Sequence, residues 1–376
     1  MTRTLRIVTG IILFVFVSTH LLNMAFGLVS LEVLDAARFY FMLPWSNPVG
    51  FLLLAGSMLG HGLLGLWAVY WRNTLQMTRY DLLQTVSALL IIPLLASHVL
   101  GVTVAANMFN LEPSYQSVLT FFWVQAPIEG LRQVLVVTVT WIHGCAGLFT
   151  WMRLKPWWPK AAGVAYPLAV IIPVSALLGF VEAGNEVVEL AANAAGGASP
   201  SSTPSPEMMA KFQLYNTIMW SVIGGYLAMI AITLVARKVR LWNSRTSMLT
   251  LSYLTGDVIR TEGGVSLLEA AEAHDLPHAN ICKGRGRCGT CRVRIISSSE
   301  ELPPPSEQEQ KTLERFECPP NVRLACQLVP ASGTIELERV LPPDVGLEAL
   351  RPPSMAATTA AENITTETDE KVEVAT

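Results

Sequence analysis

Six long apolar stretches constrain this chain most, because each is long enough to cross a lipid bilayer as a helix. Hydrophobic residues make up 51% of the 376 residues and charged residues only 15%, which is too apolar for one soluble globule. The first stretch is too long for a signal-peptide core, so we expect it to be a retained helix. We therefore expect a membrane all-α six-helix bundle with a soluble part. The approximate spans are 5–29, 49–71, 82–107, 130–152, 161–181 and 213–236.

Basic residues gather at one set of helix ends, and this bias predicts the orientation of the bundle. Acidic residues dominate the other ends, where only Arg38, Arg132 and Lys211 are basic. The positive-inside rule then places both termini in the cytoplasm. The basic residues at the inner ends are Arg3, Arg6, Arg72, Arg79, Arg153, Lys155, Lys160, Arg237, Lys238 and Arg240.

The composition changes to that of a soluble domain near Met248. We expect a six-helix transmembrane domain over 1–245, a soluble α+β domain over 246–345 and a disordered tail over 346–376. Residues 191–206 are rich in Ala, Gly, Ser and Pro and predict a flexible outer loop. In the soluble domain we expect strands at Met248–Leu254, Val258–Thr261, Cys291–Ile296 and Thr334–Arg339, a helix opened by the capping box Ser266–Glu269, and a helix at Glu307–Phe316.

Four cysteines of the soluble domain have the spacing of metal ligands. Cys282, Cys288 and Cys291 form a C-x5-C-x2-C run, and Cys326 follows far downstream. The loop after Cys282 is rich in glycine and basic residues, which suits an anionic iron–sulfur cluster. The alternative is a structural zinc site, whose ligands usually come as two close pairs in sequence. The triplet with a distant fourth cysteine favours a cluster.

Residues 248–342 resemble [2Fe–2S] ferredoxin domains. The C-x5-C-x2-C spacing with Arg-Leu-Ala-Cys-Gln is closer to the adrenodoxin-like branch than to the plant branch. The resemblance implies a β-grasp fold, one-electron transfer and a cluster ligated by Cys282, Cys288, Cys291 and Cys326. The run Gly-Arg-Gly-Arg-Cys-Gly-Thr-Cys-Arg-Val-Arg is also similar to ferredoxin domains fused to bacterial membrane-bound class III adenylate cyclases.

The first four apolar stretches contain one histidine each: His20, His61, His98 and His143. A histidine inside a bilayer is expensive and is a functional candidate by default. Measured from the basic ends, His61 and His143 lie roughly 15–17 Å along their helices, and His20 and His98 roughly 21–26 Å. Two pairs from alternate helices at two depths predict two b-type haems, each with two imidazole ligands. Hydrogen-bonded packing roles, or a single haem, remain the alternatives.

The histidine pattern resembles the di-haem cytochrome b anchor of succinate:quinone oxidoreductases over residues 5–152. The resemblance implies reactivity with a quinone or quinol, and no residue here maps onto a quinone site. Small residues beside the histidines would leave room for a porphyrin, although close helix packing explains them equally well. They are Gly60, Gly62, Ser97, Gly101, Gly144 and Gly147.

Together these features predict a redox protein of the bacterial inner membrane, with its ferredoxin domain in the cytoplasm. Electrons would move between a quinone pool, two haems and a [2Fe–2S] cluster. The chain would act either as the redox-sensing input of an adenylate cyclase-type signalling protein or as an electron-transfer component with a separate soluble partner. No cyclase domain is expected after residue 345, so enzyme activity beyond electron transfer is left open. We expect no nucleic-acid partner, and a homodimer is left open.

Overall fold

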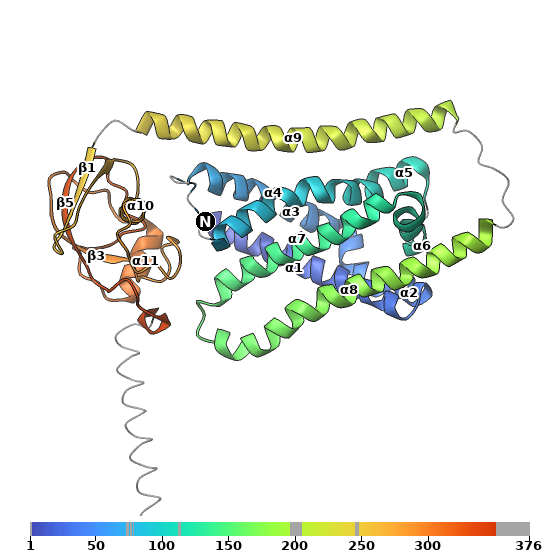
Figure 1. The fold of residues 1–376 in the computed structure, drawn as a ribbon, viewed down its shortest axis with the longest axis horizontal. Coiled ribbons are helices and arrows are strands. Elements are labelled where there is room, and N and C mark those ends of the chain that lie inside the picture. The colour runs from blue at the N-terminus through green and yellow to red at the C-terminus, as the bar shows by residue number, and fades with distance from the viewer. Residues whose placement is uncertain are drawn as a thin grey trace, which may run out of the picture. The chain divides into compact units, whose positions relative to one another are not determined.

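The computed structural model describes residues 2–72, 75, 77, 79–111, 114–195, 205–244 and 248–350. The chain divides into two compact units (Figure 1). The helical unit comprises Met1–Arg72 and Met77–Ala236, and the C-terminal unit comprises Asn73–Gln76 and Arg237–Thr376. Each unit has its own hydrophobic core.

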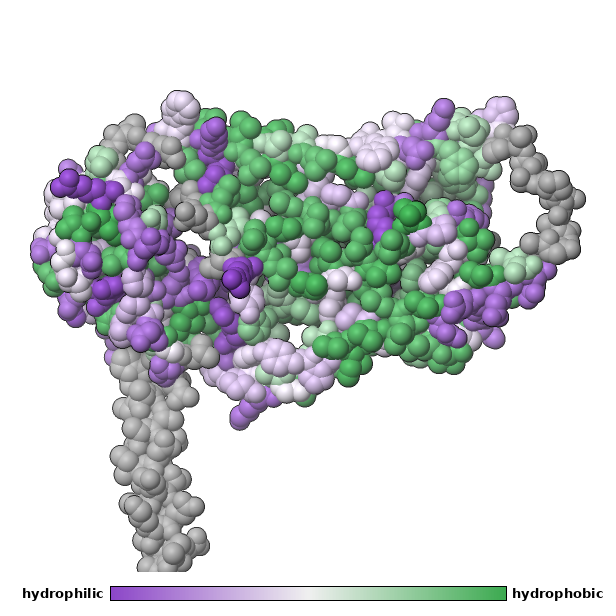
Figure 2. Space-filling view, in the orientation of Figure 1, coloured by the Kyte–Doolittle hydropathy of each residue, from purple (hydrophilic) through white to green (hydrophobic). Residues whose placement is uncertain are grey.

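In the described residues, the chain forms six helices that are long and apolar enough to cross a membrane. Figure 2 shows hydrophobic side chains covering much of the outer surface of the helical unit. Leu52, Val170 and Ile232 are among these exposed apolar residues. A surface of this kind suits contact with lipid rather than water. The six helices are α1 (Thr2–Ala25), α3 (Pro48–Tyr70), α4 (Arg79–Leu100), α7 (Pro127–Met152), α8 (Trp158–Ala195) and α9 (Pro206–Ser244).

One core of the helical unit forms where α1, α7 and α8 pack together. Leu21, Trp141 and Ala176 are buried in its middle. Two short helices absent from the sequence predictions, α2 (Leu31–Ser46) and α6 (Tyr115–Thr120), close one end around the buried Leu34 and Leu119. After α4, the chain passes through a π-helical turn, Gly101–Ala105, into α5 (Ala106–Phe109).

The last two long helices extend beyond their predicted spans. Part of the flexible loop predicted over residues 191–206 is helical, because α8 continues through the helix-favouring alanines to Ala195 and α9 begins at Pro206. Residues 196–204 lie outside the described residues. Helix α9 also extends past the predicted end of the sixth span at residue 236, because it runs on to Ser244 through Arg, Lys, Val and Leu, which all tolerate a helix.

The C-terminal unit is built on a five-stranded mixed sheet with strand order β2-β1-β5-β3-β4. Strand β1 is parallel to β5, and the other neighbours are antiparallel. Alternate residues of β1, Leu249, Leu251 and Tyr253, point into the core. The strands are β1 (Met248–Tyr253), β2 (Val258–Glu262), β3 (Arg292–Ser298), β4 (Val322–Leu324) and β5 (Gly333–Arg339).

Two helices pack with this sheet. Helix α10 (Leu267–Ala273) begins at the predicted capping box, with Ser266 and Glu269 bonding reciprocally to each other's backbone N–H. Helix α11 (Glu307–Arg315) is capped by Ser306. Within the tail predicted over 346–376, Leu347–Leu350 forms a 3₁₀ turn. Residues 351–376 of that predicted tail lie outside the described residues.

Candidate metal centres

The four cysteines of the motif come together in the C-terminal unit as two pairs. Cys291 and Cys326 have their sulfurs 3.2 Å apart, and Cys282 shares a side-chain hydrogen bond with Cys288. All four side chains are buried. In the described residues, no three His, Cys, Asp or Glu side chains converge in a way that would hold one metal ion.

This donor set fits a two-iron cluster better than zinc. A structural zinc ion draws four ligands around one point, whereas a [2Fe–2S] cluster has two ligands on each of its irons. Two buried pairs of thiols match the second arrangement. The paired sulfurs also perturb one another. The hydrogen bond from Cys288 lowers the pKa of Cys282 to about 5, and contact with Cys326 raises the pKa of Cys291 well above its ordinary value.

The backbone of the loop between the first two cysteines curls around their sulfurs. Lys283, Gly284, Gly286 and, beyond Cys288, Gly289 all have positive φ, a conformation that favours glycine. At Gly289 a side chain is excluded as well, since a Cβ would come within 2.4 Å of the Phe316 ring. The size and the conformation of glycine are therefore both needed there.

Polar groups around the loop contact the sulfurs directly. The Arg287 N–H donates to the sulfur of Cys282 at 3.5 Å, and the hydroxyl of Thr290 lies 3.0 Å from the sulfur of Cys288. Hydrogen bonds of this kind favour the charged, metal-binding form of sulfur. Sequence reasoning missed Thr290, although it lies inside the cysteine run.

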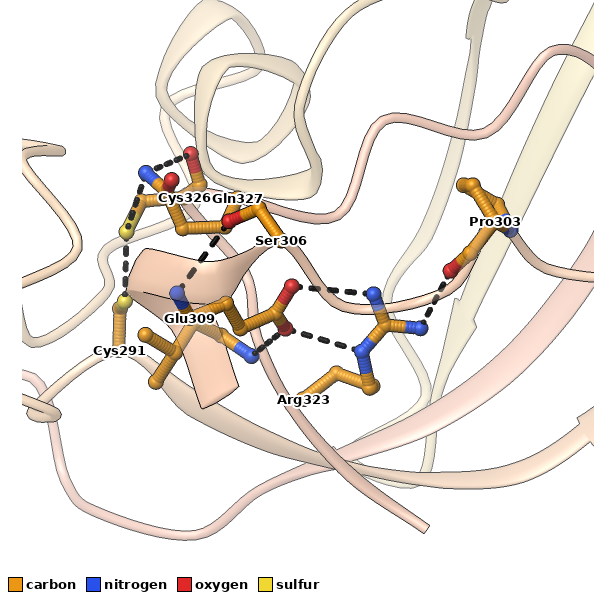
Figure 3. A network of polar contacts seen from close by, with 8 residues as sticks. Cys291, Pro303, Ser306, Glu309, Arg323, Cys326 and Gln327 are labelled. Atoms are coloured by element: carbon orange, nitrogen blue, oxygen red, sulfur yellow. Dashed lines mark hydrogen bonds and ion pairs between the residues drawn. The ribbon is translucent and has the colours of Figure 1, made fainter. Parts of the chain in front are cut away.

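A buried ion pair holds the segment that carries the fourth cysteine (Figure 3). Arg323 donates two hydrogen bonds to the carboxylate of Glu309, at 2.9 and 3.0 Å, and a third to the Pro303 carbonyl. The same carboxylate accepts from the Leu324 N–H at 2.9 Å. Glu309 is fully buried, so its carboxylate depends on hydrogen-bond donors from the protein itself. The clamp thereby fixes the backbone just before Cys326.

Comparison with known proteins agrees with this geometry. The family described as 2Fe-2S iron-sulfur cluster binding domain matches residues 255–331, a range that contains all four cysteines. The C-terminal unit carries a 2Fe-2S ferredoxin domain. The 2Fe-2S ferredoxin-5 of Aquifex aeolicus (strain VF5) is 47% identical over 49 residues, which are 13% of this chain and 51% of that protein. The chain thus spans about half the length of that relative.

Two solved structures are also similar to this part of the chain. The ferredoxin of Trichomonas vaginalis is 23% identical and is covered over 98% of its length, with a TM-score of 0.20. A point mutant of putidaredoxin, an Fe2S2 ferredoxin, is 25% identical and is covered over 94%, also with a TM-score of 0.20. Each match covers 24% of this chain. The ferredoxin domain implies electron transfer, while the roles of the individual cysteines stay predictions.

The helical unit pairs its histidines as the sequence depths predicted. The ring centroids of His20 on α1 and His98 on α4 are 6.0 Å apart, and those of His61 on α3 and His143 on α7 are 6.3 Å apart. We call these the outer pair and the inner pair, after their predicted depths. A metal–nitrogen bond to imidazole is about 2 Å long, and the ring centre lies about 1 Å beyond the nitrogen. Two imidazoles on opposite sides of one iron therefore have their ring centres about 6 Å apart. Both separations fit a shared iron.

Hydrogen bonds fix the tautomer of both inner histidines. The Nδ1 of His61 lies 3.1 Å from the Arg6 carbonyl, which can only accept, so this nitrogen carries the proton. It also lies 3.2 Å from the Thr9 hydroxyl, whose own proton goes to the Leu5 carbonyl. The Nε2 of His61 therefore keeps a free lone pair, as a metal ligand requires.

His143 is held in the same way. Its Nδ1 lies 3.1 Å from the Ser87 hydroxyl, which donates its proton to the Leu83 carbonyl at 2.6 Å. The Ser87 oxygen is therefore the acceptor for Nδ1–H. The amide nitrogen of Gln84 lies 3.3 Å from both ring nitrogens of His143. Sequence reasoning missed Thr9, Gln84 and Ser87; a polar side chain in an apolar helix was the available signal.

The outer pair has no such partners. In the part of the chain that the structure describes, the Nδ1 atoms of His20 and His98 are buried without a hydrogen bond. Aromatic rings surround them instead: Phe16 stacks on His20 at 5.8 Å, and Phe122 on His98 at 6.5 Å. The neighbouring Ser97 hydroxyl is likewise unpartnered among the described residues. Hydrogen-bonded packing, the alternative to ligation, therefore describes the inner pair only.

Close helix packing explains some of the small residues beside the histidines, but not all of them. Gly144 packs against Phe14, where a Cβ would come within 2.6 Å of the ring, so close packing explains it. Gly147 lies against Gln84 in a similar way. Gly62 is exposed and a Cβ there would meet no atom within 4 Å, so close packing does not explain it. His274 and His278, outside the motif, contact no cysteine; His278 bonds to the Tyr253 hydroxyl at 3.1 Å.

Proposed function

We propose that this chain is a membrane redox protein that holds two b-type haems and one [2Fe–2S] cluster. His20 with His98, and His61 with His143, would ligate the haems, and Cys282, Cys288, Cys291 and Cys326 would ligate the cluster. When bound, these groups accept and release single electrons. The observation that carries the proposal is the pairing of four intramembrane histidines at the separation of two imidazoles on one iron.

The chain's own residues would tune and protect these centres. Thr9, the Arg6 carbonyl and Ser87 hold Nδ1–H of the inner histidines, so that the lone pair of each ring lies on Nε2. The buried shell around the thiols excludes water, and the clamp of Glu309 on Arg323 holds the fourth ligand's segment in place. Each of these features would hold the side chains in fixed orientations, which favours binding of a metal group.

We further propose that the six helices span the bacterial inner membrane with both termini and the ferredoxin domain in the cytoplasm. The basic residues at one set of helix ends support this orientation. A quinone or quinol is the proposed electron partner within the membrane, on the strength of the resemblance to di-haem anchors. The cytoplasmic partner would be a separate redox or signalling protein.

The output of the protein has two candidate forms. The run Gly-Arg-Gly-Arg-Cys-Gly-Thr-Cys supports a sensor that reports redox state to an adenylate cyclase-type partner, by its similarity to cyclase-fused domains. The match to a stand-alone ferredoxin supports an electron-transfer component instead. Titration of cyclase activity against redox state, with this chain present or absent, separates the two.

The proposal is tested on the full chain purified in lipid. We expect a b-type reduced-minus-oxidised spectrum with about two haems per chain, and a [2Fe–2S] EPR signal after reduction. Cys288→Ser should remove the EPR signal and leave both haems, with Cys318→Ser, outside the motif, as the matched control. A chain that retains lipid and all four histidines but binds no haem would contradict the membrane half of the proposal.

A further inference from the structure

Three basic side chains gather at the cysteine run, and we call them the basic rim: Lys283, Arg292 and Arg315. Lys283 and Arg292 lie in or next to the run, and Arg315 joins them from the end of α11. The guanidinium of Arg315 donates to the Arg287 carbonyl at 2.6 Å. Lys283 and Arg315 are exposed and Arg292 is half-buried. Positive charge therefore reaches the surface directly beside the cluster loop.

The rim is held in place by one buried aromatic ring. Arg292 and Arg315 both lie on Phe316, at 4.3 and 4.7 Å from the ring centre. Phe316 in turn packs against Gly289 of the cysteine run. Cation–π contacts restrain these guanidinium groups, so little side-chain freedom is lost when a partner binds them.

The described part of the chain offers the basic rim no acidic partner. Among the residues that the structure describes, no carboxylate forms an ion pair with Lys283, Arg292 or Arg315. Basic residues elsewhere in the unit are paired, for example Arg294 with Glu338. An unpaired, preorganised group of cations raises the rate of encounter with a negatively charged partner.

We propose that the basic rim is the docking surface for an acidic face of a soluble redox protein. The inference rests on the proposed function, because the partner exchanges electrons with the cluster. Arginine, which outnumbers lysine in the rim, is enriched at protein–protein interfaces, where lysine is depleted. Electron-transfer encounters are small, so a few charges can dominate them.

The test compares two oxidants of one fold and opposite charge. Native cytochrome c is basic, and fully succinylated cytochrome c is acidic. The full chain is held in nanodiscs of zwitterionic lipid, its cluster is quantified by EPR, and re-oxidation of the reduced cluster is followed by stopped flow. We expect the succinylated protein to react faster, with a rate that falls as salt rises.

Charge variants locate the effect. Lys283→Gln with Arg315→Gln should lower the ratio of the succinylated to the native rate by roughly threefold to tenfold. Using the ratio removes any change in the cluster's own potential. Arg260→Gln is the matched control, because Arg260 is exposed on β2, at the opposite edge of the sheet from β4. We expect it to leave the ratio unchanged.

Three outcomes would overturn the inference. A ratio indifferent to the rim substitutions would exclude the rim as a docking surface. An equal effect of Arg260→Gln would assign the steering to net charge alone. If anionic lipid in the nanodiscs slows re-oxidation by both oxidants, and the rim variant restores both rates, then the rim binds the membrane surface instead. A chain without the cluster's EPR signal contradicts the proposed function instead.

Discussion

The inner pair and the outer pair place their imidazole rings at nearly equal separations, 6.3 and 6.0 Å, in surroundings of opposite character. Carbonyl and hydroxyl oxygens receive Nδ1–H of the inner histidines, whereas the outer rings lie among aromatic side chains with Nδ1 unpartnered in the described residues. A hydrogen bond to Nδ1–H makes an imidazole a more basic ligand. A more basic ligand stabilises the oxidised iron. The difference therefore assigns the lower reduction potential to the proposed inner haem and the higher to the outer.

The largest expected effect comes from removing one histidine of a pair. On the proposed function, His61→Ala should abolish the inner haem and His98→Ala the outer, each lowering the haem content from about two to about one per chain. Haem is measured by the pyridine haemochromogen assay against protein concentration. The remaining wave in a redox titration then identifies the survivor. If His61→Ala leaves the lower-potential wave, the assignment of potentials to the two pairs is reversed.

The pairing of the histidines was predictable from sequence, and their surroundings were not. Helix rise alone gives the depth of each histidine along its apolar stretch, and equal depths on alternate helices gave the pairs. Which hydroxyl meets which ring depends on the rotation and contact of two helices. Thr9 and His61 are separated by 52 residues, and Ser87 and His143 by 56. No local pattern encodes a contact over such a distance.

The same distinction holds in the C-terminal unit. The capping box at Ser266 and the strand pattern of β1 are local signals, and both predicted elements formed. Strand β4 has three residues, too few to show alternation, and it was missed. Glu309 reads from sequence as one more surface acid of α11, yet it is fully buried because Arg323 reaches it from β4. Burial of that pair follows from the tertiary fold.

A smaller effect is expected from Ser87→Ala, which sharpens the comparison without removing a ligand. The hydroxyl is the acceptor for Nδ1–H of His143, and the nearby Gln84 amide turns its nitrogen, a donor, toward the ring. The lower potential should rise by about 20–60 mV, the equivalent of one hydrogen bond in a one-electron couple. Spectroelectrochemical titration measures both waves. Ser97→Ala, beside the outer His98, is the matched control and should shift neither.

The smallest effect is expected from Thr9→Val, which removes a hydroxyl at almost constant volume. His61 Nδ1–H retains the Arg6 carbonyl at 3.1 Å after the substitution, so its donor is still satisfied. The lower potential should therefore rise by less than about 20 mV, below the shift for Ser87→Ala. Both variants are titrated side by side in the same lipid. A shift for Thr9→Val that equals or exceeds that for Ser87→Ala would show that the hydroxyl, and not the backbone carbonyl, is the acceptor that sets the basicity of His61.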